Sequence, residues 1–230
     1  MNEIVIKPSR ELAYFVGVLH SDGCIYTWND KKHHRKVNVL LINVGKLSLP
    51  MLFKVQKIFK QVFKRDIKIL NHKYDTLVFD AKINRLMPFF KELEIIKNGI
   101  PEWIKSNKIF FCSYLAGLID GDGNVKITKP RYKQCRVTII SGDKLNLKRL
   151  IMKYLKCKMW IEQINKPSTL PSGKKILPNA KRYCFCVSSK NMSTFRKHVY
   201  SEMQILHKRR TIENYFEICP RRDLNPQPSP

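Results

Sequence analysis

Two aspartates, Asp22 and Asp122, close two similar stretches of the chain. Residues 15–23 read Phe-Val-Gly-Val-Leu-His-Ser-Asp-Gly, and residues 115–123 read Leu-Ala-Gly-Leu-Ile-Asp-Gly-Asp-Gly. Each apolar run ends in Asp-Gly before a strand-like segment, so each places a carboxylate where a helix stops. A helix end exposes unpaired carbonyl oxygens and carries the negative end of the macrodipole. Carboxylate and carbonyl oxygens are ligands that Mg²⁺ takes in proteins, with water and phosphate completing the shell.

Glycines at matching points indicate that the two helices pack side by side. Gly17 and Gly117 each lie five residues before an aspartate, and without side chains they let two helix backbones approach closely. Asp22 and Asp122 would then lie close together, where two carboxylates can hold metal ions that activate a water and stabilise a leaving oxygen. The alternative is that Asp-Gly simply ends a helix in a turn, because glycine permits a sharp turn. Two copies at equivalent places favour the functional interpretation.

The net charge indicates the partner. The 230-residue chain has 44 lysines and arginines against 18 acidic residues, a formal charge of +26, and the basic residues are spread along its whole length. A compact fold with that charge repels itself unless a polyanion is its normal partner. Nucleic acid is therefore the expected partner, and a ribosomal or membrane-surface role is the alternative. The hydrophobic fraction of 43% is ordinary for a globular protein with a real core.

The sequence argues against secretion, a membrane span and a zinc knuckle. Residues 1–10 have no apolar core of signal-peptide length, and no run approaches the roughly 20 apolar residues of a membrane span. The seven cysteines show no Cys-x-x-Cys pairing, and Cys184 and Cys186 alternate along a predicted strand. The histidines lack metal-ligand spacing. We therefore expect reduced thiols, in the cytoplasm or an organellar matrix.

The first half of the chain predicts the order helix, strand, strand, helix, strand, strand, helix. Ser9 is the expected N-cap of the first helix, and Pro50 lies in the first turn of the second, where proline is favoured. The expected helices are residues 11–21, 49–63 and 83–96, the last despite Pro88, and the expected strands are residues 24–28, 36–43, 67–70 and 76–79.

The same order recurs in the second half, with helices expected at residues 113–119, 145–155, 193–199 and 203–216 and strands at 124–128, 136–141, 159–164 and 182–187. We therefore expect an α+β protein in which two pseudo-symmetric αββαββα repeats bring two four-stranded antiparallel sheets together as a long saddle. The expected divisions are residues 1–100 for the first repeat, 101–111 for a linker, 112–217 for the second repeat and 218–230 for a proline-rich, disordered tail.

The second stretch closely resembles the signature of the LAGLIDADG homing endonucleases, and the first resembles a degenerate copy that keeps Gly17, Asp22 and Gly23. The resemblance covers residues 10–217 as two repeats, as in the single-chain members of the family. It implies a monomeric, site-specific endonuclease for double-stranded DNA with a long asymmetric target, usually encoded in an intron or intein. It also implies paired sheets along the major groove, signature helices that meet at the centre, and cleavage that leaves 3′ overhangs.

The resemblance also implies a metal site. In the family the last aspartate of each motif binds Mg²⁺ (or Mn²⁺), and these acids map onto Asp22 and Asp122. The carbonyl oxygens of Ser21 and Gly121 are the expected further ligands. His20 stands where the second copy has Asp120, a position that does not carry the metal-binding acid. We expect a helix-cap or interface role for His20, and a role as a base is the alternative.

Family active sites also use basic or amide side chains that face the scissile phosphates. Lys46 follows the second strand, where the family often has Gln-Lys, whereas Asp143 at the corresponding place is a poor match, so we expect an asymmetric site. A lysine is also common near the end of each repeat, and Lys97 and Lys208 occupy those places. Lys46 and Lys208 are the catalytic candidates. For any one lysine in so basic a chain, plain phosphate contact or solvated surface is the alternative.

The period of two along a strand predicts which side chains face DNA. Residues two and four beyond each aspartate share its side of the sheet. Phosphate contacts from lysines would dominate affinity, and base-edge contacts would set the target. The tips at residues 29–35 and 166–179 are expected to reach flanking DNA. The alternative for the two aromatic candidates is a place in the core. The predicted DNA-binding residues are Tyr26, Trp28, Lys126, Thr128, Arg136, Thr138 and Arg182.

Two other functions compete with an endonuclease. Some proteins of this family act as intron maturases, with or without cutting, so an RNA-binding splicing cofactor is the second hypothesis. A catalytically inactive DNA-binding regulator is the third. Retention of both aspartates argues against the third, because no folding requirement keeps two like charges adjacent. It does not separate the first two, since cutting and splicing can share one chain.

Overall fold

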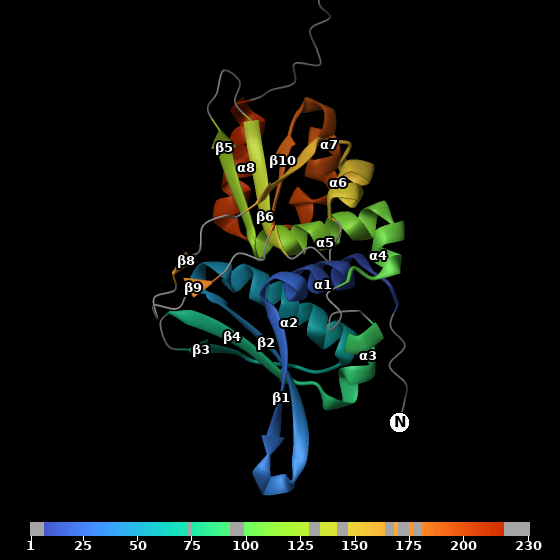
Figure 1. Ribbon diagram of the computed structural model, residues 1–230, viewed down its shortest axis with the longest axis vertical. Helices are drawn as coiled ribbons and strands as arrows, with labels where there is room; N and C mark the ends of the chain where they lie inside the picture. Colours follow the sequence, from blue (N-terminus) through green and yellow to red (C-terminus); the bar gives the residue numbers. More distant parts are fainter. Residues whose placement is uncertain are drawn as a thin grey trace, which may run out of the picture.

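The computed structural model describes residues 7–72, 75–92, 99–128, 134–141, 147–163, 168–169, 175–176 and 181–218. Two helices lie side by side at the centre of the molecule, and a four-stranded sheet lies on either side of the pair (Figure 1). The central helices are α1, Arg10–Asp22, and α5, Lys108–Asp120. The side chain of Ser9 accepts a hydrogen bond from the Leu12 N–H, which confirms the predicted N-cap of α1.

The two sheets have the same strand order. The first runs β1-β2-β4-β3 and the second β5-β6-β10-β7, so each strand has a counterpart at the same place in the other sheet. All neighbouring strands are antiparallel. The predicted α+β class with two antiparallel sheets is therefore confirmed. The strands are Gly23–Asp30 (β1), Arg35–Gly45 (β2), Ile69–His72 (β3), Thr76–Lys82 (β4), Gly123–Thr128 (β5), Gln134–Ser141 (β6), Met159–Gln163 (β7) and Lys181–Val187 (β10).

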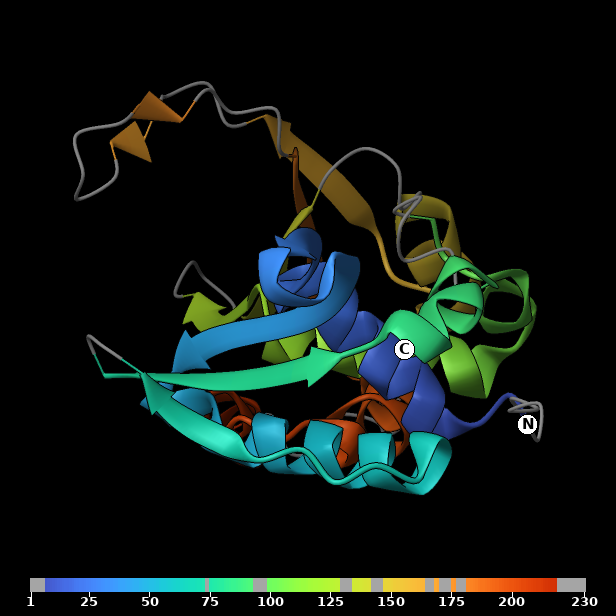
Figure 2. The same cartoon turned by 90° about the horizontal axis from the view of Figure 1, so that it is seen from below.

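The remaining helices pack around these sheets. Helix α2, Leu49–Phe63, has the predicted bounds with Pro50 in its first turn, and it covers one face of the first sheet (Figure 2). A small two-stranded ribbon of β8, Ser168–Thr169, and β9, Lys175–Ile176, projects away from the second sheet. The other helices are α3 (Met87–Glu92), α4 (Glu102–Ser106), α6 (Leu147–Leu155), α7 (Ser189–His198) and α8 (Leu206–Ile218), with short 3-10 turns η1 (Lys31–His33), η2 (Lys46–Ser48), η3 (Asn84–Leu86) and η6 (Tyr200–Glu202).

Some helix bounds differ from the sequence expectation for identifiable local reasons. The helix expected over residues 83–96 begins only at Met87, so that Pro88 falls in the first turn, where proline is tolerated; residues 93–98 lie outside the described residues. Helix α7 begins four residues earlier than expected, because the Ser188 N–H donates to the Asn191 side chain at 2.8 Å and closes its first turn.

The segment expected to be a linker, residues 101–111, is largely helical. It holds α4 and the first turn of α5, where the Asn107 side chain accepts hydrogen bonds from the N–H groups of Ile109 and Phe110. The Ile104 side chain is fully buried, so the segment is packed onto the core. The division of the chain into repeats at these residues stays a prediction. The tail from residue 219 onward lies outside the described part of the chain.

The two central helices are buried on every side. Residues 12–19 of α1 and 111–120 of α5 are all buried, which is why these segments are apolar rather than amphipathic. A Cβ atom built on Gly17 would lie 2.1 Å from the Tyr114 carbonyl oxygen, and one on Gly117 would lie 2.3 Å from the Tyr14 carbonyl oxygen. The close approach predicted from the two glycines is therefore confirmed.

One acidic side chain ties the first half of the chain to the second. Glu202 in η6 forms ion pairs with Arg10 at 2.5 Å and with Lys54 of α2 at 2.8 Å. The Lys54 ammonium also lies 3.8 Å from the centre of the Tyr14 ring. These contacts hold α2 against the crossing of α1 and α5.

None of the described helices is long and apolar enough to cross a bilayer. Six cysteines lie in the described part of the chain, and all of them are free thiols.

We expect the helix crossing to tolerate no side chain at its glycines. Gly17→Ala should lower the free energy of unfolding by about 1–3 kcal/mol, because its new methyl group collides with the backbone of α5. Gly45→Ala is the matched control: nothing lies within 4 Å of a Cβ there. Its effect should stay within about 0.5 kcal/mol. Urea denaturation measures both, and equal stability of the two variants would contradict the packing described above.

Candidate active site

The two Asp-Gly stretches meet at the C-terminal ends of the central helices. Asp22 is the last residue of α1, and Asp122 lies in the turn that follows α5. A Cβ atom built on Gly121 would lie 2.5 Å from Asp22 Oδ2 and 2.0 Å from Ser21 Oγ. The Asp22 carboxylate therefore lies against the turn that carries Asp122, as the sequence predicted.

A glycine follows each aspartate, and the sharp turn that glycine permits is not the reason. Gly23 has φ −82° and ψ 142°, an ordinary extended conformation that any residue adopts. Space is the constraint instead, because a Cβ atom on Gly23 would lie 2.6 Å from the Leu19 carbonyl oxygen, and one on Gly123 would lie 2.4 Å from the Ile119 carbonyl oxygen. Each sheet thus begins directly against the last turn of its helix.

The surroundings raise the pKa of both aspartates. Desolvation, and then the negative charge of Asp22, raise the pKa of Asp122 to about 6. Desolvation also raises the pKa of Asp22, while the Lys208 ammonium opposes that rise. Two carboxylates that repel each other offer hard oxygen donors whose repulsion a divalent cation relieves, so this donor set fits the expected metal.

Among the described residues, no group of three or more His, Cys, Asp or Glu side chains could hold a metal ion. A cation at Asp22 and Asp122 would therefore draw its further ligands from backbone carbonyl, water and phosphate oxygens.

Lys208 of α8 reaches the site but points its ammonium at the backbone. The side chain is buried, and Nζ donates to the carbonyl oxygens of Ile119 at 2.8 Å, Asp120 at 2.6 Å and Gly121 at 3.0 Å. These contacts satisfy carbonyls that the end of α5 leaves unpaired and place a positive charge at its negative pole. An ammonium has three protons, so all of them are used. The catalytic role expected of Lys208 stays a prediction, and the geometry gives it a positioning role.

The expected ligand carbonyl of Gly121 accepts this bond from Lys208. A carbonyl oxygen has two lone pairs, so one remains for a cation. Its counterpart Ser21 turns its hydroxyl back into α1, where Oγ donates to the carbonyl oxygens of Val18 at 3.0 Å and Gly17 at 3.3 Å. The ligand roles of both carbonyls stay predictions.

Lys46 lies in η2 beyond the end of β2, and its side chain is 61% exposed. Its ammonium forms an ion pair with Asp75 at 2.6 Å, and no contact with Asp22 or Asp122 appears among the described residues. Its catalytic role stays a prediction. The related candidates Lys97 and Asp143 lie outside the described part of the chain.

Two reciprocal hydrogen bonds cross between the central helices, and the sequence reasoning missed them. Tyr14 of α1 donates to Asp120 Oδ2 at 2.6 Å, while a hydrogen bond of 2.9 Å joins Tyr114 Oη of α5 to His20 Nδ1. Asp120 also accepts from the N–H groups at the start of α8, Gln204 at 2.7 Å and Ile205 at 3.2 Å. The sequence did carry a signal for these bonds, since Tyr14 stands six residues before His20 and Tyr114 stands six residues before Asp120.

His20 therefore has the interface role that we expected. Its ring meets the Tyr114 ring edge-on, with centroids 5.6 Å apart. Burial lowers the pKa of His20 to about 4, so the imidazole is neutral at physiological pH.

The outer face of the second sheet carries the predicted cationic side chains beside Asp122. The side chains of Cys135, Val137 and Ile139 turn toward the core, as do the residues opposite them on β5. The alternate residues of both strands therefore point outward. A cavity of about 210 Å³ opens on this face. Its lining residues are Asp122, Asn124, Lys126, Arg136, Thr138, Ile140 and Arg182. Thr128, the remaining prediction on this sheet, lies two residues beyond Lys126 on β5 and directly opposite Gln134 on β6.

One acidic residue on the edge strand of this sheet was not foreseen. Glu162 of β7 forms ion pairs with Arg136 and with Arg182, and it accepts a hydrogen bond from Trp160 Nε1 at 3.0 Å. The hydrogen bond from Trp160 and the two guanidinium groups lower the pKa of Glu162 to about 2. The Arg136 guanidinium also lies 5.1 Å from the centre of the Trp160 ring. Both arginines are thus fixed in place by a carboxylate that stays ionised.

On the first sheet, Tyr26 and Trp28 point outward. Their exposed fractions are 39% and 41%, so the alternative of a place in the core was wrong. The strand that the sequence could not orient, β2, turns Leu40 and Ile42 into the core, and its outward residues include Val37. The outer face of the first sheet is therefore more apolar than that of the second.

Three solved structures share this architecture. A point variant of I-DmoI in complex with its target DNA in the presence of Mg covers 84% of this chain and 96% of its own, with a TM-score of 0.55 at 18% identity. The meganuclease I-SmaMI bound to uncleavable DNA covers 91% and 90%, with a TM-score of 0.58 at 14% identity. The I-LtrWI LAGLIDADG homing endonuclease bound to target DNA covers 91% and 89%, with a TM-score of 0.54 at 17% identity. The chain has the LAGLIDADG homing endonuclease fold.

The resemblance carried by the two Asp-Gly stretches is thus confirmed at the level of the LAGLIDADG fold. No protein-family model matches the chain. The intron-encoded RNA maturase bI4 of Saccharomyces cerevisiae is 37% identical over 76 residues, a stretch that spans 32% of this chain and 12% of the maturase. This chain therefore matches only a small part of that protein.

We expect the two tyrosines of this LAGLIDADG crossing to contribute unequally to stability. Tyr14→Phe removes a hydrogen bond to a buried carboxylate and should lower the free energy of unfolding by about 1.5–3 kcal/mol. Tyr114→Phe removes a bond to a neutral imidazole and should cost about 0.5–1.5 kcal/mol. Each variant serves as the control for the other in guanidinium denaturation. A larger loss for Tyr114→Phe than for Tyr14→Phe would contradict the expected ranking of the two hydrogen bonds.

Proposed function

We propose that this chain is a site-specific endonuclease that hydrolyses double-stranded DNA with divalent metal ions. The observation that carries the proposal is the meeting of Asp22 and Asp122 at two helix ends, beside a cavity lined by Lys126, Arg136 and Arg182. A carboxylate pair alone is a weak indication, but here it lies on a face whose cations suit a phosphate backbone. The solved structures with the same fold were bound to DNA, which supports the same substrate class.

Asp22 and Asp122, together with the carbonyl oxygens of Ser21 and Gly121, would hold Mg²⁺ or Mn²⁺. When bound, such an ion supplies an activated water and stabilises the leaving oxygen of the cleaved strand. Lys208 holds the end of α5 in place and offsets part of the negative charge around Asp122. Lys46 is the remaining candidate for charge stabilisation at the phosphate.

The DNA would lie along the outer faces of the two sheets. Lys126, Thr128, Arg136, Thr138 and Arg182 would contact the duplex from the second sheet. Because the two faces differ in charge and polarity, we expect a long asymmetric target. The resemblance to the LAGLIDADG homing endonucleases further implies that one chain reads it as a monomer and that the strand cuts leave 3′ overhangs. The free thiols suit a reducing compartment, either the cytoplasm or an organellar matrix.

A role as an intron RNA maturase is the second candidate. The observation that favours it is the stretch of 37% identity to the yeast maturase. Tight binding to the transcript of the host intron, without cutting of DNA that spans the intronless insertion site, would favour this alternative.

The paired aspartates give the main prediction. Wild-type protein with Mg²⁺ should cut both strands of DNA that spans the intronless insertion site of its own gene. Asp22→Asn and Asp122→Asn should each slow the double-strand cut by at least about 100-fold, the usual effect of losing one catalytic group. Asp66→Asn is the matched control, since that carboxylate is exposed and pairs only with Lys60 among its described contacts. Cutting by both amide variants at the wild-type rate would overturn the proposal.

The acidic residue of the second sheet gives another prediction. Glu162→Gln should release Arg136 and Arg182 from their fixed positions, which would tighten non-specific binding to duplex DNA and weaken base discrimination. Selection from a randomised duplex library, followed by sequencing, measures the discrimination at each position. Glu217→Gln removes the same charge from an exposed site on α8 and should leave the selected sequence unchanged. An unchanged sequence preference in Glu162→Gln would contradict a positioning role for Glu162.

A further inference from the structure

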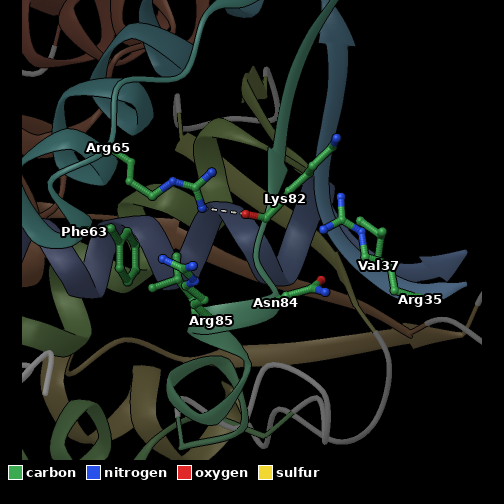
Figure 3. Close-up of a pocket in the computed structure, with 8 residues that line it drawn as sticks. Arg35, Val37, Phe63, Arg65, Lys82, Asn84 and Arg85 are labelled. Carbon is green, nitrogen blue, oxygen red and sulfur yellow. Dashed lines mark hydrogen bonds between the residues drawn. The ribbon is translucent and has the colours of Figure 1, made fainter. Parts of the chain in front are cut away.

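A second cavity lies at the far end of the first sheet. It has a volume of about 400 Å³, and four cationic side chains line it together with an apolar floor (Figure 3). Because β1 starts at Gly23 beside Asp22 and runs to Asp30, which pairs with Arg35, the cavity lies about 20 Å along the sheet from the aspartates. The lining residues are Arg35, Arg65, Lys82 and Arg85, with Val37, Phe63, Asn84 and Leu86.

The positive charge in this cavity is only partly neutralised. None of the eight lining residues is acidic. Arg35 Nε forms an ion pair with Asp30 at 3.3 Å, whereas Lys82 and Arg85 have no acidic partner among the described residues. The Arg65 guanidinium is anchored by a hydrogen bond that it donates to the Lys82 carbonyl oxygen, drawn as the dashed line in Figure 3. The cavity therefore carries an excess of positive charge.

The rim of the cavity is held rigidly to the sheet. Asn84 Nδ2 donates to the Lys36 carbonyl oxygen at 2.7 Å, and Asn84 Oδ1 accepts from the Asn38 N–H at 2.5 Å. The Val37 side chain between these two contacts is buried, as are Phe63 and Leu86. The cations thus surround a fixed apolar surface rather than a mobile loop.

Two exposed aromatic rings lie beside the cavity on the same face of the sheet. Trp28 is directly opposite Val37 in the strand register, and Tyr26 is opposite Val39, which is itself opposite Lys82. Residues paired in this way project from the same face at neighbouring positions. Neither ring stacks on another ring or on a cation among the described contacts, so both present a free π-face to solvent.

We propose that this end of the first sheet binds unpaired nucleotides, with a phosphate in the cationic cavity and a base stacked on Trp28. Surfaces that bind single strands combine these two elements, a positively charged groove for the backbone and aromatic side chains for successive bases. The faces of a paired base are covered by its neighbours in the duplex, so Trp28 gains a stacking partner only from an unpaired one. The chemistry suits single-stranded RNA and single-stranded DNA alike.

The described residues of the second sheet lack this combination. The positions that correspond to Tyr26 and Trp28 are Lys126 and Thr128 on β5. Its exposed aromatic residue, Trp160, is already engaged by Glu162 and Arg136. The proposed nucleotide site goes beyond the endonuclease function, since it uses neither Asp22 nor Asp122.

Fluorescence anisotropy with the full chain tests the site. The probes are a labelled oligouridine RNA, a labelled oligothymidine DNA and a labelled random-sequence duplex, measured without Mg²⁺ so that nothing is cut. Trp28→Ala should weaken single-strand binding by about 5- to 150-fold, the range for losing one base stack, and should weaken duplex binding by a clearly smaller factor, because a paired base offers no free face to the indole ring. Trp160→Ala is the matched aromatic control and should leave single-strand binding unchanged.

A charge variant tests the cavity independently of the aromatic ring. The double substitution Lys82→Gln with Arg85→Gln should lower the magnitude of the slope of log K against log salt by up to about 0.7 for the single strands, the value for one lost phosphate contact. Lys57→Gln with Lys148→Gln removes the same charge from two exposed helix positions and should change this slope by much less.

The binding measurements distinguish results that support the proposed nucleotide site from results that overturn it. Loss of binding to both oligonucleotides assigns the site to any unpaired strand, and loss confined to RNA assigns it to RNA; either supports the proposal. Unchanged single-strand affinity in Trp28→Ala, or an equal loss for duplex and single strands, would overturn it. Because no cleavage is measured, failure here leaves the tests of Asp22 and Asp122 unaffected.

Discussion

The approach of α1 to α5 at Gly17 and Gly117 is the contact on which the rest of the structure depends. The built Cβ positions would lie 2.1 Å and 2.3 Å from carbonyl oxygens of the opposite helix, so the two backbones are in direct contact there. This contact sets where both helices end, and therefore where Asp22 and Asp122 meet. It also fixes the start of each sheet, because Gly23 and Gly123 lie against the last turns of the same helices. Helix packing, sheet placement and the acidic pair are consequences of one crossing.

The negative charges at the crossing oppose the packing of the two helix ends, and a nearby ammonium group partly neutralises them. Two helix C-termini and three aspartates gather there, and desolvation raises the pKa of each of the three carboxyl groups. The ammonium of Lys208, spread over three carbonyl oxygens of α5, is the protein's own compensation. Because that compensation lies on the backbone rather than on the carboxylates, Asp22 and Asp122 keep oxygen atoms available for a cation.

Much of this arrangement could be predicted from the sequence, because it rests on local repetition. The order of elements, the close glycines and the outward residues of β5, β6 and β10 follow from periodicity. What could not be predicted depends on contacts between distant segments. Lys208 was expected to face a phosphate, yet it caps α5 from 87 residues away, and nothing near it in sequence indicates this. Glu162 occupies an outward position on β7, but its role appears only when Arg136 and Arg182 of neighbouring strands are placed beside it. The start of α7 was missed because an asparagine side chain, rather than an apolar period, defines its first turn.

The reciprocal tyrosine contacts join the two halves of the molecule through two similar hydrogen bonds. A phenolic hydroxyl can bond to a carboxylate or to an imidazole, so Tyr14 donates to an aspartate opposite it, while Tyr114 pairs with a histidine. Each helix thus presents a tyrosine hydroxyl to the other helix. Six residues beyond that tyrosine it carries a side chain that pairs with the hydroxyl of the other helix. A partner helix with a tyrosine and a glycine at the same positions could form the same hydrogen bonds and the same close approach of the two backbones. The hydrogen bonds at this joint thus accommodate different residues at positions 20 and 120, whereas the glycines and the ion pairs of Glu202 keep the fit between the two halves specific.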